Sequence, residues 1–341
     1  MPKLSDHPVA EDARILLLRL SALGDIVFAL PALRLLRLLR PAARIEWLCE
    51  DRHQQILAEH PDLDRVHVYP RRAGNVAIFN HLRRLHGEDP FDAVVDFQSN
   101  LKSALNLLAV RSSRTIGFSR PLSREFAHCF VKDKVGVDPR LPRAYRDIAL
   151  VQRLVGSELT DVLVEEVLHQ PAPWPLHSPA PESSADILLH TSFTHYGRDK
   201  AWPRQSWIEL ASELVAIGRH PRFLWTEDEH QQVADLAASA ECELAPATPD
   251  LPALMQLCDQ ANLLIGTDSG PLHLASWRGT PTIGLFGATD PAVYAPTGAR
   301  SRIVTALEDG QSPPIRNRTS RSPLMDAITP AMVLAAVSRR Y

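Results

Sequence analysis

The sequence predicts an α/β protein made of two doubly wound domains, each with a parallel sheet. Short apolar runs alternate with helical stretches along the first half of the chain, which is the pattern of βαβ units. Five prolines then fall between residues 171 and 184, and neither a helix nor a central strand can run through them. The alternation starts again after this segment. With 341 residues, the chain is long enough for two hydrophobic cores.

These features set the expected domain boundaries. A Rossmann-like domain is expected over residues 1–170, a proline-rich linker over 171–184, and a second Rossmann-like domain over 185–341. The last helix could pack back on the first domain.

The first domain opens on the apolar run 14–20, which predicts a buried parallel strand. A Ser-Ala-Leu-Gly turn follows, and a helix is predicted over 25–40, where Pro41 ends it. Apolar side chains recur on one face of this helix: Ile26, Ala29, Leu30, Leu33 and Leu36. Further strands are predicted at 44–48, 65–69 and 92–97.

The second domain opens on a predicted strand at 186–190. Ser206 and Glu209 have the spacing of a capping box, which predicts the start of a helix with Gly218 as its C-cap. Asp250 is expected to cap a helix that runs to Gln260. The other predicted elements are strands at 222–225, 262–266 and 282–286 and a helix at 229–240.

Composition excludes several classes of protein. Apolar residues make up 45% and charged residues 23%, as in ordinary globular domains, so a disordered or fibrous chain is excluded. The apolar run Leu30–Leu39 is interrupted by Arg34 and Arg37, so no membrane-spanning helix is expected, and residues 1–7 lack the apolar region of a signal peptide. The cysteines have no metal-binding spacing and are interpreted as thiols of a cytosolic protein: Cys49, Cys129, Cys242 and Cys258.

Charge is divided unevenly along the chain. Residues 1–150 carry 23 Lys and Arg against 18 Asp and Glu, net +5, whereas residues 151–341 carry 14 against 22, net −8. The basic half indicates a polyanionic partner for the first domain alone. Surface charge that has drifted without function explains the same asymmetry, and both interpretations stay open at this point.

A first candidate site follows the predicted strand at 262–266, in the segment Thr-Asp-Ser-Gly-Pro-Leu-His-Leu-Ala that begins at Thr267. Pro271 suits the first position of a helix, so the free amides of the first turn point toward the sheet edge where α/β proteins bind ligands. Such amides and the helix dipole suit a diphosphate, and His273, at the third helical position, could reach it. The alternative is a plain strand–turn–helix connection capped by Asp268 or Ser269.

A second candidate site is the loop 190–203, which leaves the first strand of the second domain. Hydroxyl groups (Thr191, Ser192, Thr194) stand beside cations (Arg198, Lys200), a combination that suits phosphate oxygens. A loop that only contacts solvent is the alternative.

Asp25, after the Ser-Ala-Leu-Gly turn, is a third candidate. It suits a helix N-cap. The alternative is a general base, because a carboxylate near a helix N-terminus stays ionised and able to accept a proton.

These three segments, together with Asp-Phe-Gln-Ser-Asn-Leu-Lys-Ser-Ala at 96–104, resemble glycosyltransferase family 9, the lipopolysaccharide heptosyltransferases, and most of all heptosyltransferase I. The matching motifs lie at 19–33, 96–104, 200–203, 268–275 and 279–291. They occur in the family's order and cover about residues 14–298.

The resemblance implies a GT-B fold, whose two domains face each other across a cleft, with the donor in the second domain and the acceptor in the first. It implies inverting transfer of heptose from ADP-L-glycero-β-D-manno-heptose to the Kdo of a lipid A precursor, with no metal, cofactor or nucleic acid. By motif position, Asp25 is the implied catalytic base and Lys200 the phosphate-binding lysine. The implied donor contacts are Thr191, Ser192, Glu229, Asp268, Ser269, Gly270 and His273, and the implied acceptor contacts are Gln98, Lys102, Arg120 and Arg124. The D-x-D sequence at 62–64, which in a metal-dependent transferase would hold a metal, is interpreted as a turn.

The chain departs from the family in three places. Phe28 stands where heptosyltransferases I often have histidine, the loop from Thr191 to Lys200 is about three residues longer, and the stretch after Thr305 shows no readable site. The alternatives are therefore a family 9 transferase with another nucleotide sugar or acceptor, a nucleotide-sugar epimerase of GT-B shape, and a non-catalytic nucleotide-binding module.

Basic residues in the first domain indicate where an anionic acceptor would lie. Arg34, Arg37, Arg40 and Arg44 are interpreted as a solvated helix face, with a basic surface toward an anionic membrane as the alternative. A second group is interpreted as a loop suited to an anionic lipid head group: Arg111, Arg114, Arg120 and Arg124, with Phe118, Phe126 and Phe130. We therefore predict a cytoplasmic protein, associated peripherally with the inner face of the cytoplasmic membrane.

Overall fold

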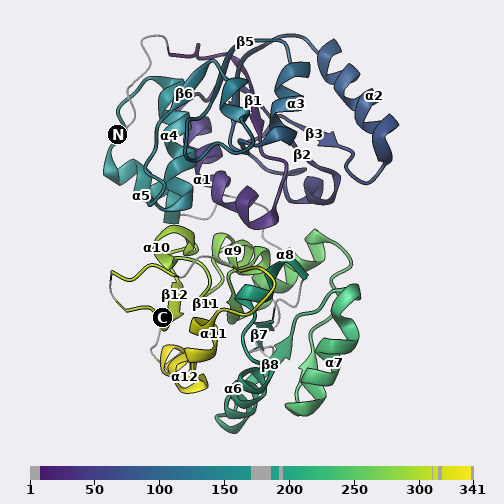
Figure 1. The fold of residues 1–341 in the computed structure, drawn as a ribbon, viewed down its shortest axis with the longest axis vertical. Helices are drawn as coiled ribbons and strands as arrows, with labels where there is room; N and C mark the ends of the chain where they lie inside the picture. The colour runs from purple at the N-terminus through teal and green to yellow at the C-terminus, as the bar shows by residue number, and fades with distance from the viewer. Residues whose placement is uncertain (1–7, 170–185, 192–194, 309, 314–316, 339–341) are drawn as a thin grey trace. The chain divides into compact units, whose positions relative to one another are not determined.

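The computed structural model describes residues 8–169, 186–191, 195–308, 310–313 and 317–338. The chain divides into two compact units, Met1–Leu168 and His169–Tyr341, which we describe one at a time (Figure 1). Each unit contains a parallel six-stranded sheet with helices, so the predicted α/β fold class is confirmed. The predicted linker at 171–184 lies outside the described residues.

The sheet of the first unit has the strand order β3-β2-β1-β4-β5-β6, and every pair is parallel. This is the order of a Rossmann fold, in which strands β1 to β3 extend the sheet in one direction and β4 to β6 extend it in the other, starting beside β1. The strands are β1 Arg14–Leu18, β2 Arg44–Glu50, β3 Arg65–Tyr69, β4 Phe91–Asp96, β5 Ser112–Phe118 and β6 Asp133–Val135. The helices are α1 Leu23–Leu39, η1 Asp51–Ile56, α2 Gly74–Gly87, α3 Leu101–Ala109, η2 Ala127–Cys129, α4 Arg143–Val155 and α5 Asp161–His169.

The sheet of the second unit repeats this topology, with the order β12-β11-β10-β7-β8-β9. Its strands are β7 Asp186–His190, β8 His220–Phe223, β9 Glu243–Leu244, β10 Leu263–Thr267, β11 Thr282–Phe286 and β12 Ser301–Thr305. Its helices are η3 His195–Lys200, α6 Arg204–Ala216, η4 Glu227–Glu229, α7 His230–Ser239, α8 Leu251–Gln260, α9 Gly270–Trp277, α10 Pro291–Tyr294, α11 Pro323–Ala327 and α12 Pro330–Ser338.

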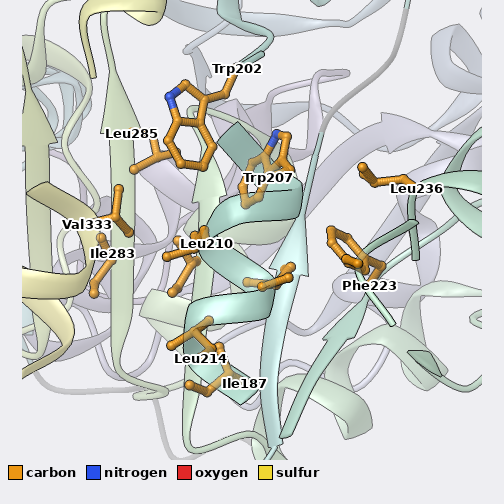
Figure 2. Close-up of a cluster of buried hydrophobic side chains, with 14 of the residues drawn as sticks. Ile187, Trp202, Trp207, Leu210, Leu214, Phe223, Leu236, Ile283, Leu285 and Val333 are labelled. Atoms are coloured by element: carbon orange, nitrogen blue, oxygen red, sulfur yellow. The ribbon is translucent and has the colours of Figure 1, made fainter. Parts of the chain in front are cut away.

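Figure 2 shows the core of the second unit, where large side chains from several elements pack together. Trp202 and Trp207 meet edge to face, with ring centroids 4.9 Å apart. Val333 of α12 is fully buried in the same cluster, so the last helix packs on the core of its own unit. The segment from Lys200 to α6 and the end of the chain thus share one core.

Several element boundaries differ from the prediction. Helix α6 begins at Arg204, with Pro203 in extended conformation as its N-cap, so Ser206 lies inside the first turn and the predicted capping box is wrong. Gly218 directly follows the C-cap Ile217 and has a positive φ of 76°, a conformation that glycine adopts without strain. Strand β8 ends two residues earlier than predicted. Asp250 caps α8 as predicted, since its side chain accepts from the Ala253 N–H at 2.9 Å.

The structure also corrects the interpretation of the basic residues. Arg34 and Arg37 are ion-paired with Asp62 at 2.9 Å and Asp64 at 2.6 Å, so they hold the turn that contains the D-x-D sequence rather than forming a solvated face. Arg114 lies in β5, not in a loop, and binds Asp133 at 3.1 Å. Phe118 ends the same strand and is buried. No helix in the described part of the chain is long and apolar enough to cross a membrane.

Candidate functional site

Two adjacent turns meet at the carboxyl edge of the first sheet, one after β1 and one after β4. The carboxamide oxygen of Gln98 accepts from the N–H groups of Leu20 and Ser21, at 3.0 and 3.2 Å. Gln98 therefore braces the turn that leads into α1. The predicted acceptor residue thus has a backbone-holding role that its motif position did not indicate.

Asp25 lies at the third position of α1, and Ala22 occupies the N-cap. The N-cap interpretation of Asp25 is therefore wrong. Its Oδ1 contacts Arg19 Nη2 at 2.6 Å and lies 3.6 Å from Arg143 Nε, while the Ala22 N–H donates to Oδ2 at 3.3 Å. The side chain is 39% exposed, so it remains accessible despite two arginines.

The surroundings of Asp25 keep it ionised. Burial tends to raise its pKa, but the charges of Arg19 and Arg143 and the hydrogen bond from Ala22 outweigh burial and hold the pKa below its ordinary value. Arg143 is itself held by Asp147 at 2.9 Å. A fixed, partly exposed carboxylate that stays ionised can accept a proton from a bound hydroxyl.

A cation cluster surrounds Glu50, the last residue of β2, and of its members the sequence analysis named only Lys102. The fully buried Glu50 carboxylate binds Lys102 at 2.9 Å, Arg71 at 3.0 Å and Arg52 at 3.0 Å. It also lies 3.3 Å from the Ser21 hydroxyl, in the turn before Asp25. Three cations around one carboxylate leave a net positive charge at this edge. The available signal was that Arg52 and Arg71 closely follow the ends of strands, where ligands bind.

The other two predicted acceptor residues lie in the segment after β5. Arg120 and Arg124 are exposed, and the guanidinium of Arg120 stands 5.3 Å from the ring centroid of Phe126. The Arg124 N–H donates to the Ser99 carbonyl at 2.9 Å, which ties this segment to the turn after β4. The structure therefore brings Gln98, Lys102 and Arg124 to the same sheet edge as Asp25.

Asp268 organises the corresponding edge of the second sheet. It follows β10 and is 6% exposed. Its Oδ2 accepts from Lys200 at 2.6 Å and from Thr289 at 2.8 Å, and its Oδ1 binds His273 Nε2 at 2.8 Å. Burial tends to raise the pKa of Asp268, but Lys200 and His273 outweigh it, so the pKa lies far below its ordinary value.

Lys200 is fixed by two of its three N–H groups. They donate to the carboxylate and, at 3.0 Å, to the carbonyl oxygen of Asp268. An ammonium group has three donors, and among the described residues only Asp268 accepts from Lys200, so the third N–H can bind an anion. Predicted donor residues from two distant segments are therefore in direct contact.

Helix α9 begins at Gly270, which places Pro271 second and His273 fourth rather than third. Ser269 is its N-cap, and the Ser269 hydroxyl lies 3.0 Å from Nδ1 of His190. Thr191 is buried beside this edge. Ser192 lies outside the described residues. Glu229 precedes α7 and accepts from the Thr226 hydroxyl at 2.9 Å.

The family model for glycosyltransferase family 9 (heptosyltransferase) matches residues 78–324. The chain belongs to this family. It is similar to lipopolysaccharide heptosyltransferase 1 of Pseudomonas aeruginosa, with 29% identity over 313 residues, which span 85% of this chain and 82% of that protein. Lipopolysaccharide heptosyltransferase 1 of Campylobacter coli is 27% identical over 81% of this glycosyltransferase and 84% of its own length.

Solved structures of the family share the fold of this glycosyltransferase. The Escherichia coli heptosyltransferase WaaC, solved with ADP, has a TM-score of 0.74 at 22% identity and covers 95% of this chain and 98% of its own. A family 9 glycosyltransferase of Veillonella parvula has a TM-score of 0.79 at 18% identity, covering 97% and 98%. The predicted resemblance and the GT-B type of fold are thus confirmed, while the roles of individual site residues stay predictions.

Proposed function

We propose that this glycosyltransferase moves heptose from ADP-L-glycero-D-manno-heptose to the Kdo region of the lipopolysaccharide inner core, with inversion and without a metal ion. The observation that carries this proposal is the pair of charged sites. An ionised, accessible Asp25 lies at one sheet edge, and a fixed Lys200 lies at the other. Similarity to heptosyltransferases 1 over most of the chain supports heptose as the sugar.

In the proposed reaction, Asp25 accepts the proton of the acceptor hydroxyl. The hydroxyl oxygen forms a bond to the anomeric carbon of heptose while the bond from that carbon to the β-phosphate oxygen breaks, and ADP leaves. Because Arg19 and Arg143 lower the pKa of Asp25, the carboxylate is ready in its ionised form at neutral pH.

Lys200 and the first turn of α9 stabilise the departing ADP. The free N–H of Lys200 donates to a phosphate oxygen, and the amides at the start of α9 supply further donors. Asp268 holds Lys200 in place, so the site needs little reorganisation when negative charge develops on the leaving group. Fixed donors of this kind take the part that a metal ion plays in other transferases.

We assign the acceptor's anionic groups to the cluster of Arg52, Arg71 and Lys102. The three cations are between about a third and a half exposed, and Glu50 holds them beside the turn that carries Asp25. Carboxylates and phosphates, which the Kdo–lipid A region carries, are the partners that guanidinium groups recognise best.

The test is to incubate the protein with ADP-heptose, with and without a Kdo–lipid A acceptor, and to measure ADP release and the heptosylated product. We expect product only with acceptor, and the same rate in the presence of a chelator. Turnover with another nucleotide sugar alone, or a rate that a chelator abolishes, would contradict the proposed donor or the metal independence.

We also propose that the protein works at the anionic inner face of the cytoplasmic membrane. Leu101, Leu105 and Leu108 lie at helical spacing on one face of α3 and are 50%, 46% and 65% exposed. Phe126, in the neighbouring segment, is 66% exposed beneath Arg120. Exposed apolar groups next to cations match a lipid surface with anionic head groups.

Vesicle binding tests this location. Replacing Leu101, Leu105 and Leu108 with serine, or Arg120 and Arg124 with alanine, should weaken binding to anionic vesicles, and salt should weaken binding of the unchanged protein. Val215→Ser, at an exposed apolar position on α6, is the matched control. Equal vesicle binding by all variants at high and low salt would rule this surface out.

A further inference from the structure

Ser269 occupies a helix N-cap without capping the helix. A serine there ordinarily accepts a hydrogen bond from the second or third N–H of the helix. Other caps in this protein do so: Asn100 accepts from Ser103 at 3.2 Å, Asp250 from Ala253 at 2.9 Å and Asp290 from Ala292 at 2.9 Å. Ser269 has the same extended backbone, φ −154° and ψ 164°, yet its side chain makes no cap hydrogen bond.

The hydroxyl of Ser269 is instead turned toward the ring of His190. Its Oγ lies 3.0 Å from Nδ1 of His190. Burial lowers the pKa of His190 to about 4, so the ring is neutral at physiological pH. It therefore does not attract a phosphate by its charge. This interaction holds the Ser269 hydroxyl toward the end of β7, away from the first turn of α9.

The position of His190 is set by the pairing of two strands. His190 ends β7 and stands opposite Gly266 of β10. A Cβ at position 266 would lie 3.2 Å from the Cβ of His190 and 3.3 Å from its carbonyl oxygen, so glycine permits this close approach. His190 is therefore held beside the turn that follows β10, where Ser269 lies.

The first turn of α9 is left with free donors. Pro271 has no N–H, and within the described part of the chain we find no acceptor for the N–H groups of Gly270 and Leu272. The neighbouring Lys200 keeps one further donor, as described above. These donors together suit a diphosphate.

We infer that His190 is a positioning residue of the diphosphate site: it holds the Ser269 hydroxyl away from the first turn of α9 and so keeps the amides of that turn free for phosphate oxygens. The inference rests on the proposed donor site and adds a residue that never touches the donor. Without His190, the hydroxyl turns to cap α9, and a phosphate must displace it before binding.

The test measures binding of ADP and of inorganic pyrophosphate by calorimetry, in a double-mutant cycle. His190→Leu keeps the side chain's bulk and removes its hydrogen bond, and it should weaken ADP binding about five-fold, which is the roughly 1 kcal/mol of a serine cap at 1.4 kcal/mol per factor of ten. In a Ser269→Ala background there is no hydroxyl to swing, so His190→Leu should then change the affinity less than about two-fold. His190→Asn, which places a hydrogen-bonding group where Nδ1 lies, should restore the affinity in the Ser269 protein.

Equal losses in both backgrounds would show that His190 acts on the diphosphate or on the fold directly, and no loss in either would show that it has no part in binding. Either result overturns the inference while leaving the proposed function intact, provided that the unchanged protein binds ADP. Failure of the unchanged protein to bind ADP or pyrophosphate would overturn the inference and the proposed donor site together. The predicted pattern without heptose transfer would support the inference and contradict only the proposed sugar.

Discussion

Asp25 and Asp268 are two aspartates with similar charge and opposite accessibility. Both lie at the carboxyl edge of a parallel sheet, and basic partners hold both pKa values below the ordinary range. Asp25 is 39% exposed, whereas Asp268 is 6% exposed and binds Lys200, His273 and Thr289. A lowered pKa alone therefore does not identify a catalytic base. The partly exposed side chain of Asp25 can meet a substrate, while the oxygens of Asp268 are used to hold other groups.

The largest effect should come from Asp25→Ala. Loss of a general base lowers turnover by at least 10²–10⁴-fold, while the ADP affinity should stay nearly unchanged because the donor contacts lie in the other unit. The measurement is kcat with ADP-heptose and acceptor, alongside calorimetric titration with ADP. Asp25→Asn, which keeps the size and the Ala22 hydrogen bond, should be as inactive. Near-normal turnover by either variant would remove Asp25 from the mechanism.

Substitution of Lys200 should have the next largest effect. Lys200→Met removes a preorganised donor to the leaving group and should lower kcat about 10²–10³-fold. Asp268→Asn keeps the Lys200 side chain but weakens the ion pair that positions it, so we expect a smaller loss of kcat. A larger loss for Asp268→Asn than for Lys200→Met would mean that Asp268 acts on the substrate directly and that the contrast with Asp25 is wrong.

The partners of Asp25 should control the pH dependence of the reaction. The double variant Arg143→Gln, Asp147→Asn removes one cation without leaving a buried carboxylate unpaired. Since the cation lowers the pKa of Asp25, its removal raises that pKa, and the acid limb of kcat/KM should move to higher pH. Asp147→Asn alone is the control. An unmoved acid limb in the double variant would show that the limb reports another group.

The smallest effect concerns a third aspartate, Asp96, which ends β4 and has no cationic partner within hydrogen-bonding distance in the described chain. Burial raises its pKa to about 6, although it accepts from Ser99, Ser103 and Gln98. A folded-state pKa above the unfolded value means that stability falls as the pH rises from about 4 to 6. Asp96→Asn should abolish that fall and raise the free energy of unfolding at pH 8 by up to about 3 kcal/mol. A large destabilisation at pH 8, measured by urea unfolding, would contradict this.

The sequence predicted the elements whose signals are local. The apolar runs of β3, β7 and β11 have the predicted bounds, and Asp250 caps α8 as expected. Strands β5, β6, β9 and β12 were missed because they are short or carry polar side chains, as in the Ser-Ser-Arg-Thr start of β5. The false capping box at Ser206 shows that a matching spacing does not decide a helix start when a proline stands just before it.

The candidate site was predictable in its motifs and not in its contacts. Lys200 and Asp268 were both predicted, but only the fold brings them within 2.6 Å. The cluster around Glu50 was missed because its members come from separate segments after β2, β3 and β4, and no single segment carries a pattern. Gln98 shows the reverse case, since its motif indicated a ligand contact and the structure shows it bonded to the backbone of the turn before Asp25.

The C-terminal residues show no site in their sequence, yet they form hydrogen bonds with the chain just before and just after Lys200. The Ser322 N–H donates to the carbonyl of Asp199 at 3.0 Å, and the Trp202 indole N–H donates to the carbonyl of Ile328 at 2.9 Å. Trimming the chain before residue 322 would remove both hydrogen bonds, one on each side of the lysine, and each loss at a buried group is costly. The C-terminal residues therefore support the segment that carries the proposed phosphate-binding lysine, and we expect their removal to impair that site as a substitution within it would.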